Sequence, residues 1–370
     1  MLAFVLFGLT FAWVASHAHT EGSQFGAYDF GIYRAAATAL VHGRPVYDRL
    51  LTLVAPYSYP PIAALVAVPM LALPLSVERW LWIVVQLAAS VVVAYVALGA
   101  IRRTRPDLAP ALTALLVAGL AASLPMRSSI RDGQVNAVLL CLVVCDTLVP
   151  RPRWPRGVLV GIAAAIKLTP ALVAIYWLLT DRRRPALRAT YTFLTLTAAA
   201  FLAFPGLSLN FWAHHVTSPT EGIALDATDN QSLRGAAERF STNHAVVLWL
   251  VASVILAVVG LLLAHRQWRR GDDLGGLAIV LITAVLVSPI GWIHHMVVLV
   301  LVGAVLIREW INGHRPIALA ALACLELAII FDIPRLHARL LPSALTENWF
   351  LIVMLAAMAA VSTLTSASSV

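Results

Sequence analysis

The sequence predicts an all-α polytopic membrane protein, and three observations lead to that expectation. Of the 370 residues, 61% are hydrophobic and only 12% are charged, which is about half the charged fraction of a soluble domain. The mean hydropathy is +0.86. Apolar runs close to the ~20 residues that span a bilayer recur along the whole chain. We therefore expect one integral-membrane domain over residues 1–370.

Arginine clusters set the predicted orientation in the membrane. Because basic loops stay on the cytoplasmic side of a bilayer, each cluster indicates an inner loop. The clusters cover residues 102–105, 151–156, 182–188, 265–270 and 308–315. The net charge of +8 is explained by these loops, so we expect membrane lipids, and no nucleic acid, as surroundings and partners.

The first half of the chain follows from this orientation. Residues 1–16 are expected to form a first helix, and residues 16–60 the first extracytoplasmic loop. Within that loop, residues 27–42 have the pattern of an amphipathic helix lying at the interface. Residues 78–101 then cross inward. Residues 110–125 and 134–149 leave and return, which places 127–132 in an external turn.

The second half continues the same alternation around a long extracytoplasmic loop over residues 205–243. The predicted crossings are residues 188–204, 244–264, 274–290, 294–307, 316–333 and 347–365.

Two apolar segments do not fit a simple crossing. Residues 61–75 contain internal prolines and link two external ends, so we expect a hairpin or half-membrane pair. Residues 157–179 have arginine clusters on both sides and the string Lys-Leu-Thr-Pro in the middle. We expect a re-entrant pair rooted in the cytoplasm, with its tip lining a cavity at mid-membrane. The total is then 10 to 12 transmembrane elements, re-entrant and half-membrane helices included.

Five polar clusters interrupt the apolar sequence, and the topology places all but part of one on the external side. Ionisable groups near a bilayer cost several kcal/mol and usually bind or react with something. The clusters are residues 29–33, 127–136, 167–170, 230–234 and 288–295. Together they predict an external cavity that deepens into the membrane.

Asp29 is the leading candidate for chemistry. A carboxylate in low-dielectric surroundings can act as a general base, although a helix N-cap explains its position nearly as well. Asp226 and Asp229, with Glu221, are reserve candidates for the base.

Cations and histidines in the other clusters suit an anionic ligand. Arg127 can bind phosphate oxygens with its planar fork, whereas Arg131 and Asp132 are expected to pair within a loop. Lys167, the only lysine of the chain, needs a buried partner, either structural or a ligand phosphate. His294 and His295 point about 100° apart on a helix, so we expect no shared metal and favour contact with a phosphate leaving group.

Amides and cysteines carry weaker signals. Asn230, Gln231 and Arg234 suit sugar hydroxyls and a phosphate, but also an ordinary loop. The free cysteines, Cys141, Cys145 and Cys324, lie in apolar runs without ligand spacing and read as small buried hydrophobes. No cofactor or metal is expected.

Six strings taken in order resemble glycosyltransferase family 87, whose members are C-type transferases that use polyprenyl-phosphate mannose. The strings are DFGIYRAAATALVHGRPVYD, SYPPIAALVAVPM, PMRSSIRDGQVN, GIAAAIKLTP, NQSLRG and LVSPIGWIHH, within residues 29–295. The sequence departs from the family pattern at the pair Arg131-Asp132 and at Gly291. These departures put the identity of the acceptor in doubt.

The resemblance implies a C-type glycosyltransferase fold with Asp29 as the catalytic base. It also implies a cavity-lining set made of Arg127, Gln134, Asn136, Lys167, Asn230, Gln231, Arg234, His294 and His295. The implied reaction is inverting transfer of mannose from polyprenyl-phosphate mannose to a phosphatidylinositol mannoside or lipomannan-like acceptor, with an α-1,2 linkage. The implied place is the extracytoplasmic face of a bacterial plasma membrane.

Two other classes of function remain open at this stage. A polytopic lipid or solute transporter would show repeat symmetry, and no internal repeat is apparent. A related C-type transferase would use lipid-linked arabinofuranose instead of mannose.

Overall fold

A computed structural model describes residues 29–47, 56–216, 223–313, 315–331 and 342–365. The predicted first helix over residues 1–16 and the reserve candidate Glu221 lie outside these ranges. All regular elements in the described part of the chain are helices. One isolated antiparallel bridge joins Asn230 to Trp292. The expectation of an all-α chain is confirmed.

The N-terminal elements lead from the first external segment to the re-entrant region. They are α2 (Asp29–Val41), α3 (Pro61–Ala67), η2 (Val68–Ala72), α4 (Leu75–Ala97), α5 (Gly99–Thr104), α6 (Ala109–Ala122), α7 (Leu124–Asp132), α8 (Asn136–Leu148), α9 (Val158–Ile166), η3 (Thr169–Ala171) and α10 (Leu172–Leu179).

The C-terminal elements comprise the segment around residues 205–243 and the remaining apolar helices. They are α11 (Arg183–Ala203), α12 (Pro205–Asn210), η4 (Phe211–His215), α13 (Leu233–Phe240), α14 (Ala245–Arg269), α15 (Asp273–Val287), η5 (Ile293–Val298), α16 (Leu299–Gly313), α17 (Pro316–Ile330), α19 (Ser343–Thr346) and α20 (Trp349–Leu364).

Several of these helices are long and apolar enough to cross a membrane. By length and composition, four pass this test in the described residues: α4, α11, α14 and the continuous segment Ile293–Gly313. The pair α6 and α7 forms a fifth, with a bend of 66° between its halves. Six further apolar helices have 10–17 residues. With the shorter helices included, the number of elements agrees with the predicted range, and the chain is a multi-pass membrane protein.

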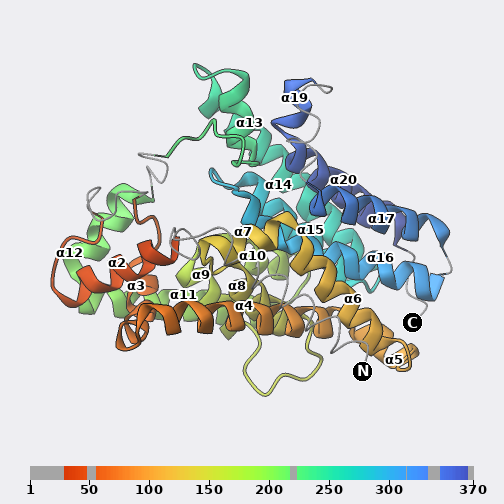
Figure 1. Ribbon diagram of the computed structural model, residues 1–370, viewed down its shortest axis with the longest axis horizontal. Helices are drawn as coiled ribbons and strands as arrows, with labels where there is room; N and C mark the ends of the chain where they lie inside the picture. The colour runs from red at the N-terminus through yellow and green to blue at the C-terminus, as the bar shows by residue number, and fades with distance from the viewer. Residues whose placement is uncertain (1–28, 48–55, 217–222, 314, 332–341, 366–370) are drawn as a thin grey trace.

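Burial separates the core of the bundle from its lipid-facing surface. In α15 all positions from Leu274 to Leu286 are buried, and α15 packs against α14, α16 and α20. By contrast, only 6% of the apolar window of α14 is buried. In Figure 1, α2, α3 and α12 gather at one end of the molecule, while α5 lies at the opposite end of α4. The arginine-rich α5 thus lies far from the Asp29 end.

Two predicted segments agree with the structure. Residues 27–42 were expected to be helical, and α2 covers Asp29–Val41. The re-entrant segment breaks where the polar string predicted it: α9 ends at Ile166, and Lys167 is extended, with φ −150° and ψ 128°. The short turn η3 and the helix α10 then continue the chain.

Two other predictions are wrong. Residues 127–132 form most of the helix α7 rather than a turn, because Ser123 caps its first turn by accepting from the Met126 amide, and Gly133 ends it with φ +70°. Residues 61–75 do not form a hairpin. Pro61 starts one short helical segment that continues through η2 to Ala72, and α4 begins at Leu75.

Candidate functional site

Asp29 is the first residue of α2 and faces the corner between α7 and α8. The side-chain amide of Gln134 donates a hydrogen bond to its Oδ2 atom. The Gln134 Oε1 atom in turn accepts from the Tyr33 hydroxyl at 3.0 Å and from the Tyr59 hydroxyl at 3.4 Å. Tyr33 also donates to Tyr59 at 2.9 Å. The carboxylate is therefore held by an amide that two tyrosines fix in turn, rather than by a cation.

The glycine at the end of α7 brings this corner close to α2. A Cβ atom at Gly133 would lie 2.6 Å from the Cβ atom of Phe30, the neighbour of Asp29. The Gly133 carbonyl accepts a hydrogen bond from the Trp82 indole at 2.8 Å. Only glycine combines the positive φ with this close approach, so Gly133 allows α2 to pack against the corner.

A second carboxylate and an imidazole lie next to Asp29. Donor atoms of Asp29, Asp132 and His294 all fall within 4.8 Å of one another. His294 Nδ1 is 3.5 Å from Asp132 Oδ2. Asp132 is also held by Ser128, at 2.9 Å, and by Arg131, at 2.9 Å. The predicted pairing of Arg131 with Asp132 is confirmed, although it lies on the helix α7 rather than in a loop. The position of Asp132 beside Asp29 was not predicted.

This group of three contains atoms that could ligate a cation. Oxygen and imidazole ligands of this kind suit several divalent ions. However, Asp132 already accepts a hydrogen bond from Ser128 and forms an ion pair with Arg131. We therefore interpret the cluster as two carboxylates beside one imidazole, which pairs with Asp132.

The surroundings of Asp29 change its acid–base behaviour. Burial raises the pKa of the Asp29 carboxyl above its usual value, because the charged form loses hydration. The nearby His294 lowers this pKa, and the negative charge of Asp132 raises it. The net effect is an increase. A carboxylate with a raised pKa is a stronger base toward a hydroxyl proton.

Lys167 connects the broken re-entrant segment to the same network. Its Nζ atom donates to Asn136 Oδ1 at 3.0 Å and lies 2.7 Å from His295 Nε2. The Asn136 amide donates to Gln134 Oε1 at 3.5 Å. A continuous chain of polar contacts thus runs from Asp29 to the lysine. The rings of His294 and His295 are inclined by 82°. As predicted, the two histidines have different partners, because His294 contacts Asp132 and His295 contacts Lys167.

A large cavity opens beside the lysine. Its volume is about 820 Å³, and Lys167, Arg234 and His295 line it together with apolar and aromatic side chains. Arg234 forms an ion pair with Glu238 at 2.6 Å. The guanidinium also lies 5.5 Å from the ring centre of Trp249. We call this space the cationic cavity, because Lys167, Arg234 and the imidazoles of His215 and His295 line it.

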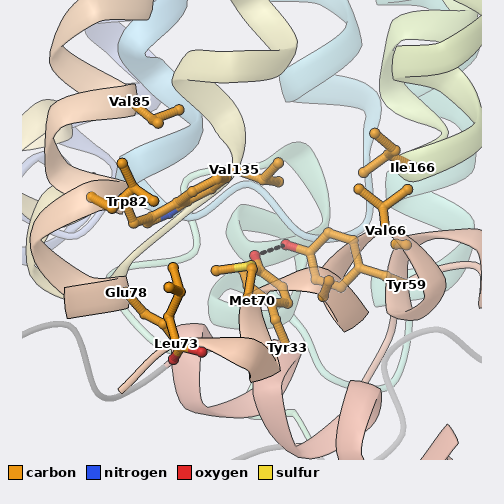
Figure 2. A pocket seen from close by; sticks show the side chains of 13 residues that line it. Tyr33, Tyr59, Val66, Met70, Leu73, Glu78, Trp82, Val85, Val135 and Ile166 are labelled. Atoms are coloured by element: carbon orange, nitrogen blue, oxygen red, sulfur yellow. Dashed lines mark hydrogen bonds between the residues drawn. The ribbon is translucent and has the colours of Figure 1, made fainter. Parts of the chain in front are cut away.

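A second pocket lies beside Tyr33 and Tyr59 (Figure 2), with a volume of about 270 Å³. Tyr33, Tyr59 and Trp82 contribute to its wall. Its other lining residues are Ala63, Val66, Ala67, Met70, Leu73, Glu78, Leu81, Val85, Val135 and Ile166. We call it the apolar pocket. Tyr59 belongs to the walls of both spaces.

Other predicted site residues have their polar groups engaged within the fold. The Asn230 Oδ1 atom accepts from the Gly291 amide at 2.9 Å. Gln231 donates to the Glu347 carbonyl at 2.7 Å and accepts from the Leu351 amide at 3.0 Å. Both amides are buried, so the geometry assigns them to positioning the loop beside η5.

Arg127 points away from the Asp29 corner. It donates to the Ile330 carbonyl at the end of α17 at 2.7 Å, and it does not line the described cavities. The reserve candidates Asp226 and Asp229 are exposed. The structure thus brings together Asp29, Gln134, Asn136, Lys167 and both histidines, with Arg234 across the cationic cavity.

Comparisons with known proteins identify the family of this chain. The sequence pattern of glycosyltransferase family 87 matches residues 57–289. A polyprenol-phosphate-mannose-dependent α-(1-2)-phosphatidylinositol mannoside mannosyltransferase of Mycobacterium tuberculosis is 32% identical over 289 residues, or 73% of this chain and 67% of the relative. Its counterpart in Mycolicibacterium smegmatis is 31% identical over 303 residues, with the same shares.

A second kind of relative differs in its acceptor. A polyprenol-phosphate-mannose-dependent α-(1-2)-phosphatidylinositol pentamannoside mannosyltransferase of Mycobacterium tuberculosis is 31% identical over 306 residues, covering 79% of this chain and 68% of the relative. No solved structure matches the chain. The range matched by the family pattern includes Gln134, Asn136, Lys167 and Arg234. The chain therefore belongs to glycosyltransferase family 87 and is a C-type membrane glycosyltransferase.

Proposed function

We propose that this enzyme transfers mannose from polyprenyl-phosphate mannose to a hydroxyl of a mannosylated lipid acceptor, with inversion and an α-1,2 linkage. The observation that carries the proposal is the half-buried Asp29, which is linked through Gln134 and Asn136 to Lys167. Lys167 in turn lines a cavity together with Arg234 and His295. The similarity to mannosyltransferases that depend on the same lipid-linked sugar supports the choice of mannose.

The reaction needs a base on one side of the sugar and a charge-stabilising site on the other. Asp29 removes the proton of the acceptor hydroxyl as its oxygen attacks C1 of mannose. The bond from C1 to the phosphate oxygen breaks, and its electron pair leaves with the lipid phosphate. A β-linked donor gives an α product in one displacement, as in inverting glycoside chemistry.

The lipid phosphate is assigned to the cationic cavity. Lys167 and Arg234 supply positive charge there, and His295 adds a hydrogen-bonding nitrogen. Such groups stabilise the charge that develops on the leaving phosphate. Because the departing polyprenyl phosphate, a phosphate monoester, is a good leaving group without protonation at neutral pH, a separate general acid is unnecessary. Phe211, Val246 and Trp249 give the same cavity an apolar wall for the start of the prenyl chain.

Acceptor and location are proposed from the relatives and the topology. The relatives act on phosphatidylinositol mannosides, as their names state, and we propose an acceptor of that kind or a lipomannan-like chain. The arginine-rich loops, inside by the positive-inside rule, leave Asp29 on the extracytoplasmic face of the plasma membrane.

Purified protein in defined lipid tests this function. We expect transfer of labelled mannose from polyprenyl-phosphate mannose to a phosphatidylinositol mannoside, and an α-1,2 linkage by methylation analysis of the product. GDP-mannose should give no product. Transfer only from polyprenyl-phosphate arabinofuranose would assign the chain to the alternative sugar instead. We expect the rate of transfer to be unchanged when EDTA is added, because no metal takes part in the proposed step.

A further inference from the structure

We infer that the apolar pocket binds the lipid chain of the acceptor, while the prenyl chain of the sugar donor uses the cationic cavity. This inference rests on the proposed function. It names which of the two lipid substrates enters between α3, η2 and α4.

The lining of the apolar pocket suits a hydrocarbon chain. Apart from the tyrosines and Glu78, all its lining side chains are apolar or aromatic. Val66 is 57% exposed and Leu81 50% exposed on the outer surface of the bundle. A chain can therefore enter sideways from the bilayer between α3 and α4. For an acceptor that is dissolved in water, burial of each methylene in this pocket is favourable, because apolar surface is removed from water.

Electrostatics argue against a phosphate in this pocket. The one carboxyl group in its lining belongs to Glu78, which is almost fully buried and pairs with Arg34. No lysine, arginine or histidine belongs to the lining in the described residues. A phosphate ester would meet a low-dielectric wall there, without a basic side chain to balance its charge. The basic groups near Asp29 face the cationic cavity instead.

The direction of the reaction places the acceptor on this side. Inversion requires the attacking hydroxyl and the leaving phosphate to lie on opposite faces of C1. The two spaces adjoin at Tyr59, which contributes to both walls. Figure 2 shows the Tyr33 and Tyr59 hydroxyls joined by a hydrogen bond at the edge of the apolar pocket. Tyr33 also bonds to Gln134, the partner of Asp29.

A pocket-filling substitution at Val66 tests the assignment. Val66→Trp places an indole at the pocket entrance, and Leu65→Trp is its matched control. Leu65 is the preceding residue of α3, 39% exposed, and does not line the pocket. The acceptors are methyl, butyl and decyl α-mannosides, with polyprenyl-phosphate mannose as donor.

In wild type and in Leu65→Trp, we expect the acceptor KM to fall as the chain lengthens, by up to roughly fourfold for each methylene that enters the pocket. In Val66→Trp this dependence should flatten, with the KM for methyl mannoside and for the sugar donor unchanged. An increased donor KM with an unaltered decyl mannoside KM would assign the pocket to the prenyl chain and overturn the inference. An unaltered dependence on chain length in Val66→Trp would overturn it as well.

A binding measurement separates this inference from the proposed function. A decyl α-mannoside with a terminal diazirine is photolysed with wild-type protein, and the labelled peptides are located by mass spectrometry. We expect labels within residues 61–85, lost in Val66→Trp and kept in Leu65→Trp. Labels confined to residues 205–250 would refute the pocket assignment. Absence of mannose transfer in the presence of the expected labels would refute only the proposed function.

Discussion

Asp29 lies where a general base for a sugar hydroxyl is needed, and its neighbours set its charge state. Gln134 donates to its Oδ2 atom, and within the described residues no lysine or arginine side chain donates a hydrogen bond to this carboxylate. Without a directly paired cation, the carboxylate keeps its affinity for a proton. Burial then raises its pKa. The imidazole of His294 lies near both carboxylates, since one ring nitrogen is within 4.8 Å of an oxygen of Asp29 and of Asp132.

The rate of transfer should follow the ionisation of Asp29. Below its raised pKa the carboxyl is protonated and cannot accept the acceptor proton, so kcat/KM should fall as the pH decreases. We expect this acid limb above pH 3.8, the usual value for an aspartate. A pH profile of kcat/KM in defined lipid measures it. An acid limb at or below the usual value would contradict the assigned surroundings.

Asp132→Asn probes the neighbouring negative charge. Because Asp132 raises the pKa of Asp29, its neutralisation should move the acid limb of the profile to lower pH. Asp107→Asn is a matched control, since Asp107 is an exposed loop aspartate paired with Arg105. The control should leave the profile unchanged. A shift to higher pH in Asp132→Asn would show that its hold on His294 outweighs the direct charge effect.

Lys167 is expected to hold the lipid phosphate as well as the re-entrant corner. Charge-assisted hydrogen bonds contribute about 1.5–3 kcal/mol, so Lys167→Met should weaken donor affinity by roughly 10-fold to 100-fold. The thermal midpoint should be measured beside the donor KM, because Lys167 also contacts Asn136 and His295. Arg127→Ala should lower stability with little effect on donor KM. A large donor effect in Arg127→Ala alone would reverse the two assignments.

Single residues of the site were partly predictable from the sequence. An ionisable group inside an apolar segment is conspicuous, and this is how Lys167, Asp29 and the two histidines were found. The contact of Asp132 with His294 joins positions 132 and 294, and only the packing of α7 against η5 brings them together. The contacts of Tyr33 and Tyr59 with Gln134 also join positions far apart in the sequence, so these tyrosines were not recognised as part of the site.

At the scale of elements, the corner between α7 and α8 supports α2. Gly133 has φ +70°, and a side chain there would collide with Phe30. Gly133→Ala should therefore combine backbone strain of about 1–2 kcal/mol with displacement of Asp29. We expect a lower thermal midpoint together with a lower kcat.

Gly43→Ala is the control for this substitution. Gly43 also has a positive φ, +64°, but nothing lies within 4 Å of an added Cβ atom. The backbone strain is comparable, while the contact with α2 near Asp29 is missing. The thermal midpoint should fall with kcat unaffected. Equal losses of kcat in both variants would mean that strain alone, and not the position of Phe30, explains the result.

The elements that the sequence predicted well had signals in their own residues. Arginines on both flanks and the string Lys-Leu-Thr-Pro located the break between α9 and η3. The mistaken turn over 127–132 came from topology, which required a reversal there. The Ser123 cap, Pro125 and Gly133 were local helix signals that deserved more weight. Prolines at 61 and 69 were read as a hairpin, yet they fit the first turns of α3 and η2.

At the scale of the whole molecule, the bundle separates a basic end from a reactive end. Figure 1 shows α5 and the region around α2 at opposite ends of α4. This arrangement agrees with a cytoplasmic α5 and an external Asp29. Two cavities that meet at Tyr59 depend on contacts between distant segments. They were therefore beyond what hydropathy and motif order could predict.

Cysteine labelling tests this orientation. In a chain with the three native cysteines replaced by alanine, Ala224→Cys should react with a membrane-impermeant maleimide on intact cells. Arg151→Cys, its counterpart in an arginine-rich loop, should react only after permeabilisation. Both positions are exposed. The opposite pattern would place Asp29 in the cytoplasm.

The most direct measurement of the central claim is mannose transfer by purified Asp29→Asn in defined lipid, compared with wild type at the same protein concentration. Since the fold raises the pKa of Asp29, it favours the neutral carboxyl, and the ionised form lowers stability at neutral pH. Asp29→Asn should thus keep or increase the thermal midpoint while turnover falls at least ~100-fold, the usual share of a general base. Near-normal turnover in a folded Asp29→Asn protein would contradict the account.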